Sequence, residues 1–365
     1  MNTTRTSVLA TVTGTAAALL LVGAAGTASA HDAKGGSTVV GHVYEATNAA
    51  TGNGVAVFDR HADGSLHPVG TVATGGLGAG ASLHSQGGVA RDGRIVFVVN
   101  AGDDSVSALA STRHGLVLRD RISTGGDFPV SVTVRGGVGY VLNQGDDTIR
   151  GFRYDADGDL HGLAGSTRSL TPNAAGGTTD AAQVSFTPDG RSLVVTEKAA
   201  NRIETFRVVG GYAGDATPRP SAGTTPYGFD FDRRGHLIVS EAATGSASSY
   251  ALRPFGVVTG ALADTQKAAC WLVVSRDWAY VVNAASTSIS SYRIAHDGSL
   301  TLASAVAATT GAGPTDAAVS SDGTTLSVRL GDGSVSSFRI GRQGGLTAIG
   351  SAAGTAYGTS GLVAD

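Results

Sequence analysis

The chain has 365 residues, of which 41% are hydrophobic and only 15% are charged, so it is long enough to bury one large core. Its formal net charge at pH 7 is -3 and its Lys and Arg residues form no cluster, which argues against nucleic acid or an anionic membrane as a partner. The 54 glycines favour a β-rich protein with many tight turns.

The N-terminus has the pattern of an export signal. A single basic residue, Arg5, precedes an apolar run over residues 8–25, and the small-residue triplet Ala28-Ser29-Ala30 follows it. Because this run is interrupted by polar residues and is shorter than a membrane span, we interpret residues 1–30 as a signal peptide cleaved after Ala30. The mature protein is then expected to be secreted, with residues 31–38 as a short linker.

From residue 39 onward one pattern recurs in chain order. An apolar strand and an Asp-Gly type of turn are followed by a second apolar strand that ends in Asn or Glu, and then by a third strand and a Gly-rich fourth strand. Seven second strands are recognisable, at residues 43–44, 96–100, 140–143, 193–197, 237–241, 280–283 and 326–328. Their spacing of a little over 40 residues is the period of a four-stranded propeller blade, with one longer connection over residues 165–180.

The two ends of the repeat region complement each other. The first copy begins at its second strand, residues 39–47, and the chain finishes with an unpaired first strand, residues 360–364. Together they would complete one blade and close the ring. The sequence therefore predicts an all-β fold over residues 39–365, a seven-bladed β-propeller closed by its C-terminal strand.

Five polar residues share one position in successive blades, at the end of the second strand. We expect them to approach the central funnel, where the two carboxylates could act as general acid or base and where Glu and Asn oxygens would also suit Ca²⁺. The alternative is that these Asn and Glu side chains only initiate the following turn. The predicted catalytic residues are Glu197 and Glu241, and the asparagines, predicted to bind ligand, are Asn100, Asn143 and Asn283.

Other residues are predicted to surround the same mouth, because loops after second strands and connections between blades share one face of a propeller. Those assigned to ligand binding are Gln86, Gln183, Lys198 and Trp271, and Asp180 and Asp316 are expected beside them. Cys270 is expected to be a buried structural thiol, since no partner histidine is evident. The Asp155-x-Asp157-x-Asp159 run is interpreted as a turn, because it lacks the Gly and Glu of a calcium loop.

Several segments resemble the lactonase-type seven-bladed propellers, which include bacterial 6-phosphogluconolactonases and fungal muconate-cyclising enzymes. The resemblance covers roughly the whole mature chain and is carried by Ser85-Gln86-Gly87-Gly88, Asn100-Ala101-Gly102-Asp103-Asp104-Ser105-Val106-Ser107, Val195-Thr196-Glu197-Lys198, Ala269-Cys270-Trp271 and Ile289-Ser290-Ser291-Tyr292. It implies a propeller fold and lactone chemistry. The family's His, Arg and Glu of established activity are not matched, since the corresponding segments read Ala182-Gln183-Val184, Asn283-Ala284 and Ala269-Cys270-Trp271.

Two functions therefore stand side by side at the level of sequence. One is an exported hydrolase or isomerase acting on a lactone or related cyclic ester, with Glu197 or Glu241 as acid or base. The other is a non-catalytic propeller that binds a small molecule or a partner protein. We expect a monomer with a small-molecule ligand; the sequence requires no cofactor, and Ca²⁺ is the cation it would suit.

Overall fold

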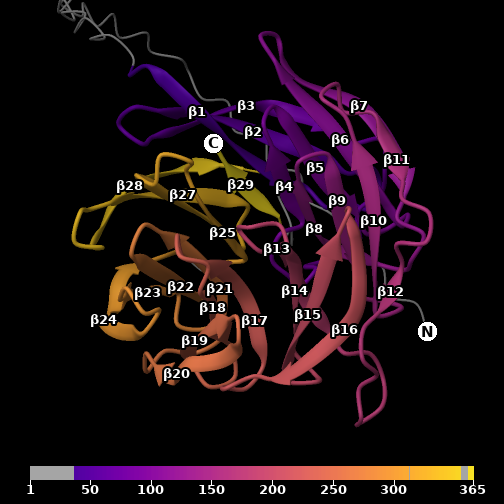
Figure 1. Ribbon diagram of the computed structural model, residues 1–365. Coiled ribbons are helices and arrows are strands. Elements are labelled where there is room, and N and C mark those ends of the chain that lie inside the picture. Colours follow the sequence, from indigo (N-terminus) through magenta and orange to yellow (C-terminus); the bar gives the residue numbers. More distant parts are fainter. Residues whose placement is uncertain (1–36, 312, 355–360) are drawn as a thin grey trace, which may run out of the picture. The chain divides into compact units, whose positions relative to one another are not determined.

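The computed structural model describes residues 37–311, 313–354 and 361–365 (Figure 1), so the predicted signal peptide lies outside the described residues. All regular elements in these ranges are β-strands. In the described ranges we find no helix with the length and apolar character that crossing a membrane would need.

The described residues form seven antiparallel sheets in which consecutive strands pair. The strands of blades 1 to 3, first strand first, are β29 (Leu362–Ala364), β1 (Val39–Ala46), β2 (Gly54–His61) and β3 (Leu66–Ala73); β4 (Val89–Asp92), β5 (Ile95–Asn100), β6 (Ser105–Thr112) and β7 (Gly115–Ser123); and β8 (Pro129–Arg135), β9 (Val138–Asn143), β10 (Thr148–Tyr154) and the divided fourth strand, β11 (Leu160–Gly162) with β12 (Arg168–Ser169). Those of blades 4 to 7 are β13 (Ala181–Phe186), β14 (Ser192–Glu197), β15 (Arg202–Val209) and β16 (Tyr212–Pro220); β17 (Pro226–Phe231), β18 (Leu237–Glu241), β19 (Ser246–Leu252) and β20 (Phe255–Ala263); β21 (Ala269–Ser275), β22 (Trp278–Asn283), β23 (Ser288–Ile294) and β24 (Leu300–Thr309); and β25 (Asp316–Val319), β26 (Thr325–Arg329), β27 (Ser334–Ile340) and β28 (Leu346–Ala353).

The first strands of the blades form the inner wall of a ring. β29 packs against β4, β4 against β8, β8 against β13, and the series continues through β17, β21 and β25 back to β29 (Figure 1). This closed series confirms the predicted seven-bladed propeller. We call the face that carries the second-to-third loops and the connections between blades the loop face, and the opposite face, with the tight turns, the turn face.

Local sequence explains the turns. The predicted Asp-Gly turns lie between first and second strands, and their glycines Gly93, Gly190 and Gly323 have φ values of 55°, 69° and 68°. This left-handed conformation is readily adopted by glycine, because it has no Cβ.

The hydrophobic core lies between the blades. All six residues of β5 are buried, because blades on both sides cover it. Across the junction of blades 2 and 3, the Phe97 ring centre lies 5.9 Å from that of Phe152 and 4.7 Å from that of Tyr154. Burying an aromatic side chain of this kind stabilises a fold by about 1.5–3 kcal/mol. Each blade therefore depends on its neighbours for most of its stability.

The ring is closed by strand pairing between the two ends of the repeat region. β29 pairs with β1, as predicted, and completes blade 1. The carboxylate of Asp316, in blade 7, accepts a 2.7 Å hydrogen bond from the main-chain N–H of Gly361 just before β29. Across the same junction Arg329 Nε lies 2.7 Å from Oε1 of Glu45, and both side chains are buried. A buried, well-oriented pair of this kind joins β26 of blade 7 to β1 of blade 1.

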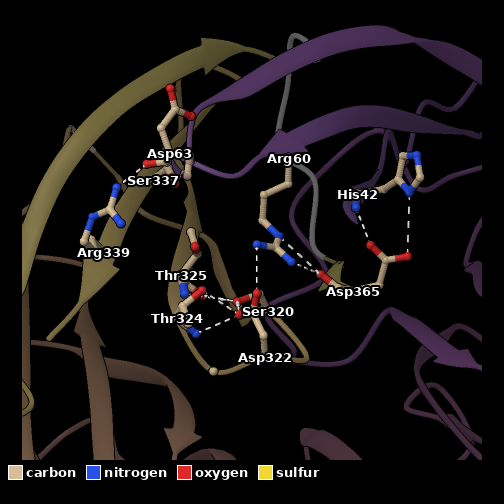
Figure 2. A network of polar contacts seen from close by, with 12 residues as sticks. His42, Arg60, Asp63, Ser320, Asp322, Thr324, Thr325, Ser337, Arg339 and Asp365 are labelled. Carbon is tan, nitrogen blue, oxygen red and sulfur yellow. Dashed lines mark hydrogen bonds and ion pairs between the residues drawn. The ribbon is translucent and has the colours of Figure 1, made fainter. Parts of the chain in front are cut away.

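A second group of polar contacts holds the end of β29 on the turn face (Figure 2). Arg60 lies 3.2 Å from the Asp322 carboxylate of blade 7 and donates a 2.8 Å hydrogen bond to the main-chain oxygen of Asp365. The Asp365 carboxylate accepts from the main-chain N–H of His42 and lies 3.2 Å from Arg91 of blade 2. Blades 7, 1 and 2 are thereby joined through Arg60 and Asp365.

Removal of residues 356–365 should lower the stability of the whole domain. The deletion takes away the first strand of blade 1 with buried Leu362 and leaves Arg60 and Asp316 without these partners, so we expect a loss of roughly 3 kcal/mol or more. Thermal unfolding of the truncated and full-length domains tests this, with Arg60→Met expected to show a smaller loss in the same direction. Arg121→Gln, which removes an exposed ion pair with Asp103 and a 3.5 Å hydrogen bond to Ser105, is the control. An unchanged midpoint after truncation would contradict the role of β29.

Candidate functional site

The chain itself fills the centre of the ring. The main-chain N–H of Gln86 donates to Ala182 O of blade 4 at 3.1 Å, and the hydroxyl of Ser85 donates to Val130 O of blade 3 at 2.8 Å. Trp271 Nε1, on blade 6, donates to Ser85 O at 2.9 Å. A segment that bonds to inner strands on several sides of the ring must lie within it. We call residues 83–88 the axial segment.

Two glutamine side-chain amides form the pair of hydrogen bonds that a neighbouring main chain would otherwise make. Gln86 donates through Nε2 to Leu272 O at 2.8 Å and accepts from the Leu272 N–H at 3.0 Å. Gln183 makes the same pair of bonds with Phe229, at 3.0 and 2.8 Å. These amides satisfy main-chain groups of first strands, β21 of blade 6 for Gln86 and β17 of the adjacent blade 5 for Gln183. Both glutamines therefore bond to the inner wall of the ring.

The five polar residues at the ends of the second strands do not meet at the funnel. Each is fully buried and turns toward the third strand of its own blade, reaching residues five or seven positions later. The partners are Ser105 and Ser107 for Asn100, Thr148 for Asn143, Arg202 for Glu197, Ser248 for Glu241, and Ser288 and Ser290 for Asn283. The expected convergence is therefore corrected: antiparallel pairing places these side chains over their own sheet. Their catalytic and ligand-binding roles stay predictions.

Glu197 lies in a buried charge cluster within blade 4. Its Oε2 lies 2.6 Å from Nη2 of Arg202, whose Nε is 3.5 Å from Glu204. Glu204 also accepts a 2.9 Å hydrogen bond from the Thr171 N–H. Burial, together with the neighbouring Glu204 carboxylate, raises the pKa of Glu197 to about 8 despite Arg202. Glu197 is therefore largely protonated at neutral pH.

Glu241 is held by hydroxyl groups. Its Oε1 accepts from Ser248 at 2.6 Å, from Ser221 at 2.7 Å and from Tyr250 at 3.4 Å. Burial raises the pKa of Glu241, although these hydroxyls act in the opposite direction. A Cβ at Gly223 would come within 2.5 Å of the Glu241 side chain, so the connection between blades 4 and 5 packs directly on this carboxyl group. The geometry suits an anchor for that connection.

Glu197→Gln should change how stability depends on pH. From about pH 4.5 to 8 the folded state retains a proton on Glu197 that the unfolded state releases, so this residue makes stability fall as pH rises. The variant should match the parent at about pH 4 and exceed it in thermal midpoint by a margin that grows with pH up to about pH 8. Some pH dependence should remain, because burial raises the pKa of Asp316 to about 7. If the thermal midpoints of parent and variant changed equally with pH over this range, the protonated state of Glu197 would be contradicted. Replacement of an exposed carboxylate, Asp157→Asn, is the control.

A second cluster lies beside the axial segment on the loop face. Lys198 Nζ lies 3.1 Å from the Asp180 carboxylate, donates a 2.6 Å hydrogen bond to the main-chain oxygen of His84, and sits 5.1 Å from the centre of the Tyr227 ring. The Lys198 side chain is only 7% exposed, whereas that of Asp180 is 48% exposed. Burial lowers the pKa of Lys198, with Asp180 opposing the shift. The pair thus presents a poorly hydrated cation next to an accessible carboxylate.

Trp271 and Cys270 lie beside this cluster. The Trp271 and Tyr227 rings pack edge to face with centres 5.5 Å apart. Burial raises the pKa of Cys270 to about 12, with Lys198 partly offsetting the shift, so its thiol stays protonated at neutral pH and is a poor nucleophile. The structure brings together Lys198, Trp271, Asp180 and the axial segment with Gln86, as the sequence predicted for this mouth.

Within the described ranges no group of three or more His, Cys, Asp or Glu side chains is arranged to hold a metal ion. Asp155 Oδ1 instead accepts from the main-chain N–H groups of Asp157, Gly158 and Asp159 at 2.9 to 3.0 Å, which is the geometry of a turn.

The sequence analysis missed that the axial segment enters the ring. A signal for it is present, because the connection before blade 2 spans residues 74–88, whereas those before blades 3 and 6 span only 124–128 and 264–268. A connection this long exceeds what is needed to join neighbouring blades. Length does not reveal that it folds inward.

Comparison with known families agrees with this geometry. The profile of the family described as "Lactonase, 7-bladed beta-propeller" matches residues 50–163 and 132–271, which together make up more than half of the chain. The chain belongs to this lactonase propeller family. A search among curated proteins found no match.

Solved structures show the same fold at low sequence identity. A protein of Bacteroides uniformis, provisionally assigned as a 6-phosphogluconolactonase, superposes with a TM-score of 0.73 at 18% identity, covering 89% of this chain and 99% of that one. A periplasmic gluconolactonase of Pseudomonas aeruginosa gives 0.70 at 18% identity, covering 88% and 98%. A protein of Lactobacillus plantarum gives 0.73 at 15% identity, covering 89% and 99%. At these identities the likeness concerns the fold.

Proposed function

We propose that this protein is a lactonase-like hydrolase that acts on a sugar-derived lactone at the loop-face mouth of the ring. Membership of the lactonase propeller family supports the class of reaction, and two of the similar structures carry gluconolactonase names. The observation that carries the proposal is the pairing of buried Lys198 with half-exposed Asp180 beside the axial segment. A desolvated cation next to an accessible carboxylate can supply an oxyanion donor and a general base for ester hydrolysis.

The proposed roles follow from the available donors and acceptors. An ammonium group has three N–H donors, and Lys198 uses two of them on Asp180 and His84 O, so the third can bind the lactone carbonyl oxygen. Asp180 accepts a proton from the attacking water as oxygen adds to the carbonyl carbon. Lys198 stabilises the resulting oxyanion. When the ring C–O bond breaks, the leaving alkoxide takes up the proton, and the product is a hydroxy acid.

Lactone hydrolysis releases acid and can be followed by pH-stat titration with a panel of aldonolactones. We expect Asp180→Asn and Lys198→Met to lower kcat/KM by about 100-fold or more. Asp180 is half exposed, so Asp180→Asn should fold normally even if replacing buried Lys198 lowers the thermal midpoint. Arg121→Gln is the matched control away from this cluster.

Glu197→Gln and Glu241→Gln complete the experiment. Retained activity in both would assign the two buried carboxyls to the structure of their blades. Loss of activity in a folded Glu197→Gln or Glu241→Gln protein, with Asp180→Asn still active, would refute the Lys198–Asp180 site and support the roles predicted from sequence.

A second candidate function is a non-catalytic binding propeller. The observation in its favour is the axial segment, because it occupies the space in which a funnel ligand would otherwise sit. Absence of acid release above background with every lactone would favour this second function, and the mouth cluster would then be a binding site for an oxyanion.

We also propose that residues 1–30 direct export. The basis is the sequence pattern alone, ending in Ala28-Ser29-Ala30. Expression of the full chain in a secreting bacterial host, followed by N-terminal sequencing of the protein in the medium, should give His31 as the first residue. Recovery of the intact chain in the cells only would contradict export.

A further inference from the structure

The turn face has a groove where the ring is least tightly packed. The outer strands β16 and β20 of blades 4 and 5 make less contact than the outer strands at any other junction in the described ring. A cavity of about 630 Å³ opens there, between the turns around Asp189 and His236 and the turn that ends at Phe255. This volume is typical of a small-molecule site.

A second cavity lies next to the first on the turn face. It measures about 680 Å³, lies below blades 6 and 7, and shares Arg234 with the first. The two cavities together form what we call the turn-face groove. A ligand that uses both must be extended.

The turn-face groove carries an excess of positive charge in a chain whose formal charge is -3. Two aspartates, Asp189 and Asp277, are among its lining residues, together with six arginines: Arg219, Arg233, Arg234, Arg253, Arg293 and Arg342. Asp189 pairs with Arg253 at 3.2 Å, and Asp277 is shared by Arg233 and Arg234 at 3.0 and 3.3 Å. In the described part of the chain, Arg219, Arg293 and Arg342 form no ion pair.

Aromatic rings lie next to these guanidinium groups. Arg219 lies 5.9 Å from the centre of the Phe255 ring, so the pair bridges the gap between β16 and β20. In the second cavity Trp278 packs on Gly344, where a Cβ would come within 2.1 Å of the indole, and this close packing fixes the ring. Each cavity therefore combines an aromatic side chain with arginines that have donors to spare.

We propose that the turn-face groove binds an acidic oligosaccharide. Arginine forks match carboxylate and sulfate groups, and aromatic rings pack on the apolar faces of sugar rings. The two adjacent cavities, about 630 and 680 Å³, offer room for an extended chain of several sugars. A nucleic acid fits less well, because the protein has a formal net charge of -3 at pH 7.

This site is independent of the proposed lactonase activity. Its residues come from the turns of blades 4 to 7, whereas Lys198 and Asp180 lie on the loop face. Binding and hydrolysis can therefore be lost separately, and each proposal can fail without the other.

Calorimetric titration of the folded protein tests the site with tetragalacturonate, a heparin-derived tetrasaccharide, monomeric galacturonate, neutral maltotetraose and single-stranded oligodeoxythymidylate. We expect at least one acidic tetrasaccharide to bind at least tenfold more tightly than the monomer, with affinity falling as salt is raised. Maltotetraose should not bind. The comparison of the two acidic chains shows whether carboxylate or sulfate is the preferred group.

Variants locate the binding. Arg219 and Arg293 lie one in each cavity, and neither forms an ion pair in the described structure. Arg219→Gln and Arg293→Gln should each lower the affinity for the acidic tetrasaccharide at least tenfold, with thermal midpoints unchanged. Arg121→Gln on blade 2 is the matched control and should bind as the parent does. The proposal is overturned if maltotetraose binds equally well, if no acidic tetrasaccharide binds, if the two variants bind as the parent does, or if the oligodeoxythymidylate binds as tightly.

Discussion

Each blade of this protein is stable only when neighbouring blades cover its faces, and the whole structure depends on that requirement. The six buried residues of β5 show the condition at one blade, since apolar clusters on both sides enclose them. It holds for blade 1 only when β29 pairs with β1. The contacts of Arg60, Asp316 and Arg329 at that junction therefore stabilise far more than the short strand they hold.

The same packing requirement explains why the ends of the second strands are polar. Where a strand is covered on both faces, water does not reach the polar groups of the connection that passes over its end. The Asn or Glu side chain at the strand end forms hydrogen bonds with the third strand and the connection in place of water. In blade 2 this is Asn100 with Ser105 and Ser107, and in blade 5 it is Glu241 with Ser248. In blade 4 the position holds Glu197, whose raised pKa is the electrostatic consequence of burying it near Glu204.

The axial segment lies between the Lys198–Asp180 cluster on the loop face and the groove on the turn face. Because residues 83–88 bond to blades 3, 4 and 6, a ligand on the loop face meets Lys198 and Asp180 at the mouth and finds no open channel behind them. On the turn face the groove opens where β16 and β20 separate. A shallow reactive mouth and a distant charged groove would suit an enzyme that acts on small lactones while held on a larger acidic carbohydrate.

The sequence by itself determined the fold, because a propeller blade is encoded locally. Turn glycines such as Gly93 and Gly190 and the apolar second strands are readable within about 45 residues, the length of one repeat. The complementary ends at residues 39–47 and 360–364 follow from the order of strands in that repeat. It also predicted that Gln86, Lys198, Asp180 and Trp271 gather on one face, because loops after second strands and connections between blades share a face.

Only the tertiary structure decided what those side chains contact. The bond from Gln86 to Leu272 and the approach of Lys198 to His84 join residues far apart in the chain, and no repeat predicts them. Repeat symmetry also led to the expectation that Glu197 and Glu241 face the funnel. Antiparallel pairing within each blade directs them to their own third strands instead, because the register of the paired main chains sets the direction of each side chain.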